Sequence, residues 1–150
     1  MPSANSRPMQ SNKPGFSITI PSQTQLLRMV VELTKHITVL YHFPPVMAEK
    51  ISLAVDEAVT NVIKHSYQNS EDRELTIEYF PLPEGLKIRI VYTGTPPQFS
   101  TNEIDLPQMI KTKRKGGLGV ELMRRIMDSV DYQTVNGINT CELVKWLKAT

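Results

Sequence analysis

The chain has 150 residues, of which 40% are hydrophobic and 21% charged, and its formal net charge is +2. This length favours a single domain with its own core, and the near-neutral charge gives no support for nucleic-acid binding. The single cysteine, Cys141, excludes an internal disulfide and the paired-cysteine metal and redox motifs. No apolar run approaches the ~20 residues of a membrane span and no signal-peptide pattern opens the chain, so we expect a cytoplasmic protein without membrane contact.

The start of the chain differs in composition from the rest. Residues 1–15 are rich in Ser, Asn, Pro and Gln and lack periodicity, which is typical of a disordered tail. Residues 16–150 are expected to form the single domain. Its first element is a short strand, predicted over Phe16–Ile20.

Two helices are expected next. Ser22 and Gln25 fit a capping box, which predicts a first helix from this point to about Tyr41. Pro44 and Pro45 end that helix and preset the backbone for a second one.

The second helix contains the most informative stretch, residues 51–67 (ISLAVDEAVTNVIKHSY). At ~100° per residue, Glu57, Asn61 and His65 climb one edge of an apolar stripe, and His65 falls inside the apolar arc itself. Burying such groups unpaired costs roughly 1–3 kcal/mol each. The row therefore indicates either a polar ligand or simply a solvated helix edge.

The second half of the chain alternates strand and helix signals. Residues 74–80 and 86–92 predict two strands joined as a hairpin. Residues 93–115 are interrupted by Gly and Pro, and a loop of this length inside a compact domain is typically a lid or a binding loop. A third helix follows, opened by glycines.

Two final strands, about 131–135 and 140–147, flank Asn136-Gly137, which is a strong hairpin signal. The predicted order is β-α-α-β-β-loop-α-β-β. This order predicts an α/β (α+β) fold, a two-layer sandwich in which helices cover one face of a mixed, mostly antiparallel sheet.

The glycine run 116–119 (GGLG) stands where the third helix begins, after a basic run at residues 111–115. Free N–H groups, the helix dipole and the absence of side chains make such a helix start suitable for phosphate. Taken alone, the run is a weak signal and favours a simple tight turn. It matches neither the Walker pattern nor the dinucleotide pattern.

The helix row and the glycine run complement each other chemically. An Asn oxygen can occupy one position on Mg²⁺ while phosphates and water fill the others, and a Glu one turn earlier can deprotonate an attacking hydroxyl. Glu57 and Asn61, followed by the glycine run, therefore indicate a phosphoryl-transfer layout.

These motifs resemble those of the GHKL (Bergerat-fold) ATP-binding domains, most closely the small anti-sigma-factor serine/threonine kinases of the RsbW and SpoIIAB type. The resemblance covers about residues 16–147. It is carried by four segments: FSITIPSQTQ, LAVDEAVTNVIKHSY, KGGLGVELMRRIMDSVDY and NTCELVKWL. It implies the histidine-kinase-like ATPase fold and binding of ATP with Mg²⁺.

The resemblance also implies residue roles. Glu57 would be the general base that activates a Ser or Thr hydroxyl of a partner, and Asn61 would ligate Mg²⁺. Residues 93–115 would form the ATP lid, and Thr140 would lie beneath the adenine pocket. The further residues implied at the nucleotide are Lys64, His65, Tyr92, Gly94, Lys115, Gly116, Gly117, Leu118, Gly119 and Val120.

One position departs from the family pattern. The family normally carries an Asp, two residues before a Gly, that accepts a hydrogen bond from the adenine amino group. Here Tyr92 takes the Asp position and Gly94 the Gly position. Losing a hydrogen bond to a charged group costs roughly 1.5–3 kcal/mol, or about 10- to 150-fold in affinity.

The resemblance implies a kinase that sequesters a sigma factor or similar effector, phosphorylates a STAS-type (anti-anti-sigma) antagonist and forms a homodimer. The alternative is a non-catalytic partner-binding module on the same fold, with weak or lost nucleotide binding because of Tyr92. A histidine-kinase catalytic domain is a third interpretation. Two observations count against this third interpretation. The sequence shows no preceding two-helix dimerisation and phosphoacceptor region, and His36 has no following acidic residue.

Overall fold

The fold is taken from a computed structural model that describes residues 13–97 and 115–148, apart from the side chains of residues 115–118. Most of the predicted tail and most of the predicted lid lie outside these ranges. In chain order, the elements are β1 (Phe16–Pro21), η1 (Thr24–Leu26), α1 (Leu27–Leu40), α2 (Pro45–Asn61), η2 (Val62–Ser66), β2 (Glu74–Leu82), β3 (Gly85–Tyr92), α4 (Lys115–Ile126), β4 (Ser129–Val135) and β5 (Ile138–Trp146).

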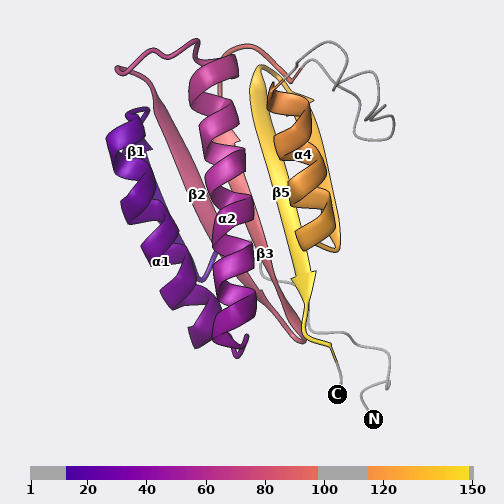
Figure 1. The fold of residues 1–150 in the computed structure, drawn as a ribbon. Coiled ribbons are helices and arrows are strands. Elements are labelled where there is room, and N and C mark those ends of the chain that lie inside the picture. The colour runs from indigo at the N-terminus through magenta and orange to yellow at the C-terminus, as the bar shows by residue number, and fades with distance from the viewer. Residues whose placement is uncertain (1–12, 98–114, 149–150) are drawn as a thin grey trace.

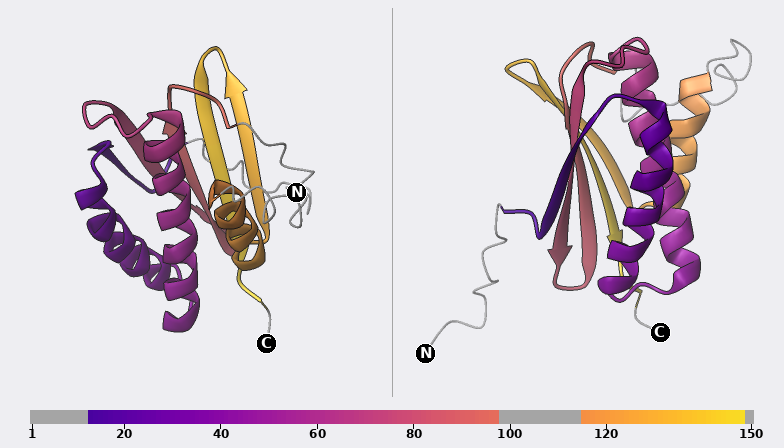
Figure 2. Two further views of the ribbon diagram at one scale, coloured as in Figure 1. Left: turned by 45° about the horizontal axis from the view of Figure 1, so that its top comes forward. Right: turned by 90° about the vertical axis from the view of Figure 1, so that its left-hand side faces the viewer.

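The strands form one sheet in the order β1-β2-β3-β5-β4. The helices α1, α2 and α4 all cover the same face of this sheet (Figure 1), and the side view shows one helical layer and one sheet layer (Figure 2). The predicted two-layer fold is therefore confirmed. The sheet was expected to be mixed, but each of its four pairings is antiparallel.

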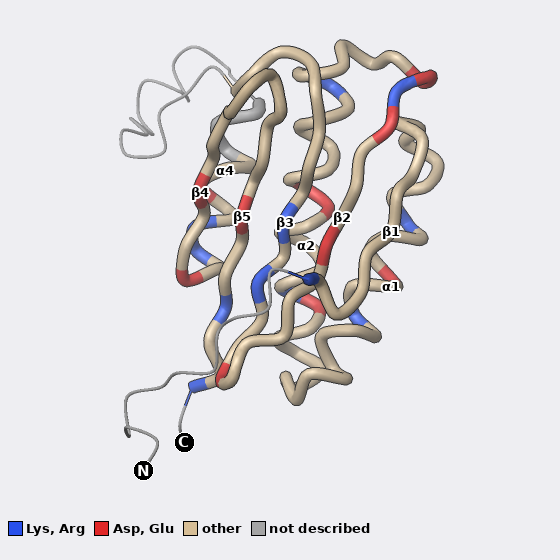
Figure 3. The backbone as a smooth tube through the Cα atoms, turned by 180° about the vertical axis from the view of Figure 1, so that it is seen from behind, with Lys and Arg blue, Asp and Glu red and all other residues tan. Residues whose placement is uncertain are grey.

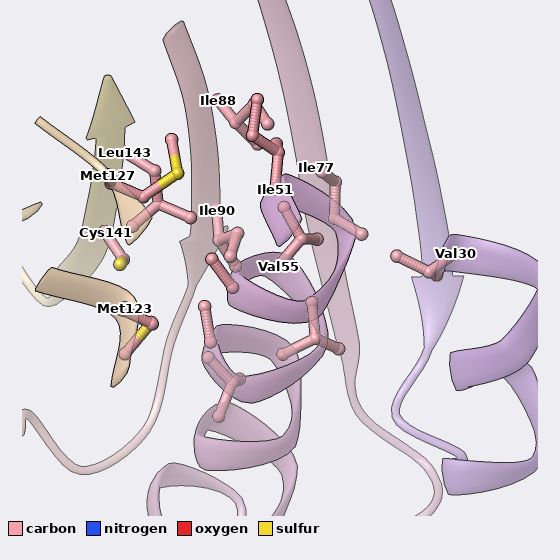
Figure 4. Close-up of a cluster of buried hydrophobic side chains, with 14 of the residues drawn as sticks. Val30, Ile51, Val55, Ile77, Ile88, Ile90, Met123, Met127, Cys141 and Leu143 are labelled. Atoms are coloured by element: carbon pink, nitrogen blue, oxygen red, sulfur yellow. The ribbon is translucent and has the colours of Figure 1, made fainter. Parts of the chain in front are cut away.

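The core lies between the two layers. Because side chains alternate along a strand, β3 buries Ile88 and Ile90 against the helices, where they meet Ile51 and Val55 of α2 (Figure 4). Cys141 packs in the same cluster as a buried, free thiol. No helix in residues 13–97 and 115–148 is both long and apolar enough to cross a bilayer.

The opposite face of the sheet is uncovered by helices and carries charges on its central strands (Figure 3). Arg89 of β3 reaches both neighbouring strands: its Nε lies 2.8 Å from Glu78 Oε1 on β2, and its Nη1 lies 3.6 Å from Glu142 Oε1 on β5. The guanidinium also lies over the Phe80 ring, with its Cζ atom 4.7 Å from the ring centroid.

The local turn and cap predictions had different outcomes. The Asn136-Gly137 hairpin is confirmed, with φ of 52° and 78° at its two central residues. The capping box is wrong, because the Ser22 hydroxyl donates to the Ser70 carbonyl at 2.6 Å and accepts from the Arg73 N–H at 3.1 Å. Ser22 thus ties the start of the domain to the loop before β2.

A buried hydroxyl pair joins the helical layer to the sheet. The Thr34 hydroxyl donates to the Val30 carbonyl at 2.7 Å, so the Tyr79 hydroxyl, also at 2.7 Å, donates to Thr34. Both residues are fully buried. Burial raises the pKa of Tyr79 to about 12, although the hydrogen bond to Thr34 acts in the opposite direction.

The two members of this pair are expected to differ in their effect on stability. Tyr79→Phe removes a donor whose acceptor keeps its own bond, which costs about 1 kcal/mol, whereas Thr34→Val leaves the buried Tyr79 hydroxyl unpaired and costs about 1–3 kcal/mol. Urea unfolding measures both. Thr19→Val, which breaks the exposed Thr19–Thr76 bond, is the control and should change stability by less than about 0.5 kcal/mol. Equal losses for Tyr79→Phe and Thr34→Val would contradict the assignment of the donor.

Candidate functional site

The end of α2 changes its helical geometry at Asn61. The helix continues as a π-helical turn, η2, in which the Tyr67 N–H donates to the Val62 carbonyl at 2.9 Å. A π turn holds more residues than an α turn, so the residues after Asn61 point in directions that differ from those on a regular α-helical wheel. His65, predicted inside the apolar arc, is exposed for this reason, and Lys64 is exposed beside it.

Glu57, Asn61 and Gly119 meet where α4 packs against α2. A Cβ atom on Gly119 would lie 2.4 Å from Glu57 Oε2 and 3.8 Å from Asn61 Nδ2. Only a residue without a side chain allows this approach. The two motifs that the sequence singled out are therefore in direct contact in the fold.

The residues at this contact fit a phosphate-bearing ligand and a cation. Asn61 Nδ2 is buried and has no hydrogen-bond partner within the part of the chain that the structure describes, so it offers a donor for a phosphate oxygen. The same side chain carries an amide oxygen, a ligand that suits Mg²⁺. The described residues include no group of three or more His, Cys, Asp or Glu that could hold a metal. Of the described residues, Asn61 would therefore be the protein ligand of a cation at this site, and phosphate and water would supply the other ligands.

The glycine segment forms the start of α4, as predicted. Gly116 and Gly117 lie in the first turn, where backbone N–H groups have no acceptor within the helix. The side chains of Lys115 and Leu118 lie outside the described part of the structure. Val120, which the family resemblance implied at the nucleotide, is fully buried in the core.

Tyr92 lies at the end of β3, with its side chain in the core. It is 4% exposed, and its ring meets the Tyr67 ring edge-on at a centroid distance of 6.5 Å and an angle of 87°. Burial raises the pKa of Tyr92, and the nearby Cys141 and Tyr67 raise it further, while a hydrogen bond with Ser66 opposes them. A neutral aromatic ring therefore fills the position at which the family pattern expects a carboxylate.

Gly94 follows Tyr92 in a conformation that suits glycine. Its φ is +92°, and a Cβ would lie 2.6 Å from the Ser66 carbonyl oxygen and 3.0 Å from the Tyr67 ring. Tyr67 also bonds to the backbone on both sides of this corner, since its hydroxyl donates to the Glu74 carbonyl and accepts from the Thr93 N–H. The chain after β3 is thus packed tightly against η2.

Asn139, which the sequence reasoning missed, completes this corner. It is buried, its Nδ2 donates to the Gly94 carbonyl at 3.2 Å, and its Oδ1 accepts from the Thr134 hydroxyl at 2.7 Å. Thr140, predicted beneath the adenine pocket, faces the uncovered side of the sheet. The alternation of side chains along β5 requires this, because Cys141 faces the helices. That same alternation could have identified Asn139.

The contact of Glu57, Asn61 and Gly119 lies within a known domain pattern. The model of the histidine kinase-like ATPase domain matches residues 20–145. The chain belongs to this family. The family pattern therefore spans all the strands and helices except the first residues of β1 and the last residue of β5.

Several curated proteins are similar to this chain in sequence. The serine-protein kinase RsbW of Listeria monocytogenes serovar 1/2a is 32% identical over 96 residues, which is 61% of each chain. The serine-protein kinase RsbW of Bacillus subtilis is 24% identical over 144 residues, which is 93% of this chain and 89% of the relative. The match therefore spans less than two thirds of the Listeria relative.

The fold is also similar to a solved structure, that of the SiaB–SiaC complex from Pseudomonas aeruginosa. The TM-score is 0.63, with 88% of this chain and 89% of the other chain covered. The sequence identity is 9%. This likeness confirms the fold.

The close approach of Gly119 to Glu57 predicts an energetic coupling between the two positions. In a Glu57→Ala background, Gly119→Ala should stabilise the protein by about 0.5–1 kcal/mol, because alanine favours a helix interior. With Glu57 present, this gain should vanish or reverse, because the new Cβ displaces the carboxylate. Urea unfolding of the four proteins gives the coupling energy.

Gly85→Ala is the control for this cycle. A Cβ there would lie 2.5 Å from the Lys145 backbone carbonyl, which cannot turn away as a side chain can. We expect Gly85→Ala to be destabilising to the same extent in both backgrounds. An equal gain from Gly119→Ala with and without Glu57 would contradict the geometry of the site.

Proposed function

We propose that this protein is an anti-sigma-type kinase that uses MgATP to phosphorylate a Ser or Thr hydroxyl of a partner protein. The observation that supports this proposal best is the close approach of Gly119 to the Glu57 carboxylate, with the Asn61 amide beside it. It brings the start of α4, which suits phosphates, to a carboxylate and an amide on α2. These are the parts that phosphoryl transfer to a hydroxyl requires.

Each residue in the proposal has a defined task. Glu57 accepts the proton of the attacking hydroxyl, and Asn61 holds Mg²⁺ through its amide oxygen. The N–H groups at the start of α4, around Gly117, bind phosphate oxygens and orient them. Bound MgATP supplies the phosphoryl group, whose transfer breaks the bond to the departing ADP. The contribution of the chain itself is thus positioning and one proton acceptor.

The proposed partners follow from the names of the relatives. Because relatives are named serine-protein kinase RsbW, we propose a STAS-domain antagonist as the phosphate acceptor and a sigma factor or similar effector as the alternative partner. We also propose that the protein forms a homodimer and is located in the cytoplasm. The domain is proposed to extend over residues 16–150, with Lys64 and His65 near the phosphates or the lid.

Loss of the Glu57 carboxylate should separate chemistry from binding. Glu57→Gln keeps the shape of the side chain but removes the proton acceptor, so the rate of phosphotransfer should fall about 10²–10⁴-fold while ATP affinity changes little. Radiolabelled phosphotransfer to a purified STAS-domain protein and calorimetric titration with ATP measure the two effects. Asn61→Ala should instead abolish the dependence of ATP binding on Mg²⁺.

Asp56→Asn is the matched control, because Asp56 is the adjacent carboxylate of α2 and bonds only to Thr60 in the described structure. It should leave phosphotransfer within about twofold of the wild type. Unchanged phosphotransfer in Glu57→Gln would exclude Glu57 as the general base.

A second candidate function is favoured by Tyr92. A buried ring at the position where the family pattern has an adenine-binding carboxylate leaves no charged acceptor there. On this alternative, the domain binds its partner without phosphorylating it, and nucleotide binding is weak or lost. Partner binding that does not respond to ATP would support it.

The two candidates predict different nucleotide binding. If the protein is a kinase, the wild type binds MgATP, and Tyr92→Asp binds it about 10- to 150-fold more tightly through the restored hydrogen bond. Calorimetric titration with and without Mg²⁺ measures this. Tyr92→Ala separates the effect of opening the space from that of the carboxylate, and thermal denaturation checks that each variant folds.

Binding of ATP by Tyr92→Asp but not by the wild type would favour the non-catalytic module. If neither protein binds ATP while both remain folded, the nucleotide argument is wrong.

A further inference from the structure

We propose that the phosphate-accepting protein docks on the outer face of α2, along a row of exposed residues that leads to Glu57. This inference rests on the proposed kinase function and specifies its acceptor. The row, called here the α2 stripe, consists of Val46, Lys50 and Leu53. At ~100° per residue, these three residues and Glu57 fall within roughly 60° of one another on the helix.

Two of the three residues in the α2 stripe are apolar, although an outer helix face is normally polar. Val46 is 69% exposed and Leu53 is 43% exposed, whereas Ile51 and Val55 on the opposite side are buried against the sheet. In the ribbon view, α2 lies between α1 and α4, and no other described helix or strand covers its outer side (Figure 1). Exposed apolar residues in a row beside a functional residue indicate an interaction surface.

Each flank of α2 makes a contact with the neighbouring helix, and the row runs between these contacts. On one side Glu49 Oε1 lies 3.5 Å from Lys35 Nζ of α1. On the other side Gly119 of α4 contacts Glu57. Lys50, by contrast, forms no ion pair within residues 13–97 and 115–148.

The position of Glu57 identifies the occupant. A general base must come within about 2.6–3.2 Å of the hydroxyl oxygen it deprotonates, so the acceptor protein must touch the helix around Glu57. Leu53 is one turn away, at a typical Cβ separation of about 5–6 Å. An acceptor that reaches Glu57 from the side of the stripe must therefore also cover Leu53.

The chemistry of the stripe describes the acceptor surface. Apolar side chains would cover Leu53 and Val46, and a carboxylate would pair with Lys50. The acceptor is thus a protein that presents a Ser or Thr hydroxyl with apolar residues and an acidic residue on the same side. Docking on the stripe would also determine which hydroxyl reaches Glu57.

The test uses the full chain and, as probes, the purified unphosphorylated STAS-domain proteins of the source genome. Leu53→Ala and Lys50→Glu are compared with Met29→Ala, which truncates a residue of α1 that is 46% exposed, and with Lys148→Glu. Calorimetric titration without ATP gives the dissociation constant, and steady-state phosphotransfer gives KM and kcat for the acceptor.

Both stripe variants should raise the dissociation constant and KM about tenfold, with kcat within about twofold and the controls unchanged. Replacing the paired acidic residue of the acceptor by Lys should restore binding to Lys50→Glu. Normal binding by both stripe variants overturns the docking proposal and leaves the kinase proposal intact. Weakened binding without any phosphotransfer in the wild type supports docking but overturns the kinase. A wild type that binds no probe overturns both.

Discussion

The crossing of α4 over α2 at Gly119 is the contact on which the candidate site depends. Because position 119 has no side chain, the Glu57 carboxylate can lie against the backbone of α4, and Asn61 lies beside it. A larger residue would separate the helices or turn Glu57 away, and either change would move the carboxylate from the start of α4. The absence of a side chain at position 119 thus allows the start of α4 and the Glu57 carboxylate to lie together. The rest of the fold provides the stiff sheet against which both helices pack.

Much of the fold could be predicted because its signals are local. The Asn136-Gly137 turn depends on two residues that tolerate positive φ, and the strands of both hairpins follow from short apolar runs beside turn residues. The remaining features depend on distant partners or on backbone geometry that no spacing reveals. Ser22 bonds to the loop before β2, and the π turn after Asn61 carries His65 out to solvent. The pairing of Glu57 and Asn61 could be predicted from their spacing. To predict which face of the sheet carries Asn139, one must follow the alternation of side chains along β5 residue by residue.

The corner around Tyr92 differs in character from the corner around Glu57. At Glu57 the structure leaves a buried amide nitrogen without a partner, as expected of a residue that awaits a ligand. Around Tyr92 the hydroxyl, ring and backbone groups bond to one another, through Ser66, Tyr67 and Asn139. The domain therefore combines a corner with an unpartnered buried polar group, at Asn61, and a corner whose polar groups bond to one another, at Tyr92. Entry of a nucleotide base at this position requires the contacts around Tyr92 to break.

The ladder of Glu78, Arg89 and Glu142 on the uncovered face has a consequence for folding. If β2 or β5 slipped by one residue relative to β3, these charges would turn toward the apolar layer and lose one another, because a slip of one reverses every side chain. Such misaligned pairings are therefore disfavoured. Correct alignment of β3 with β5 also places Asn139 opposite Tyr92 and next to Gly94. The strand register that forms these ion pairs on the uncovered face is thus the same register that positions Asn139 on the face toward the helices.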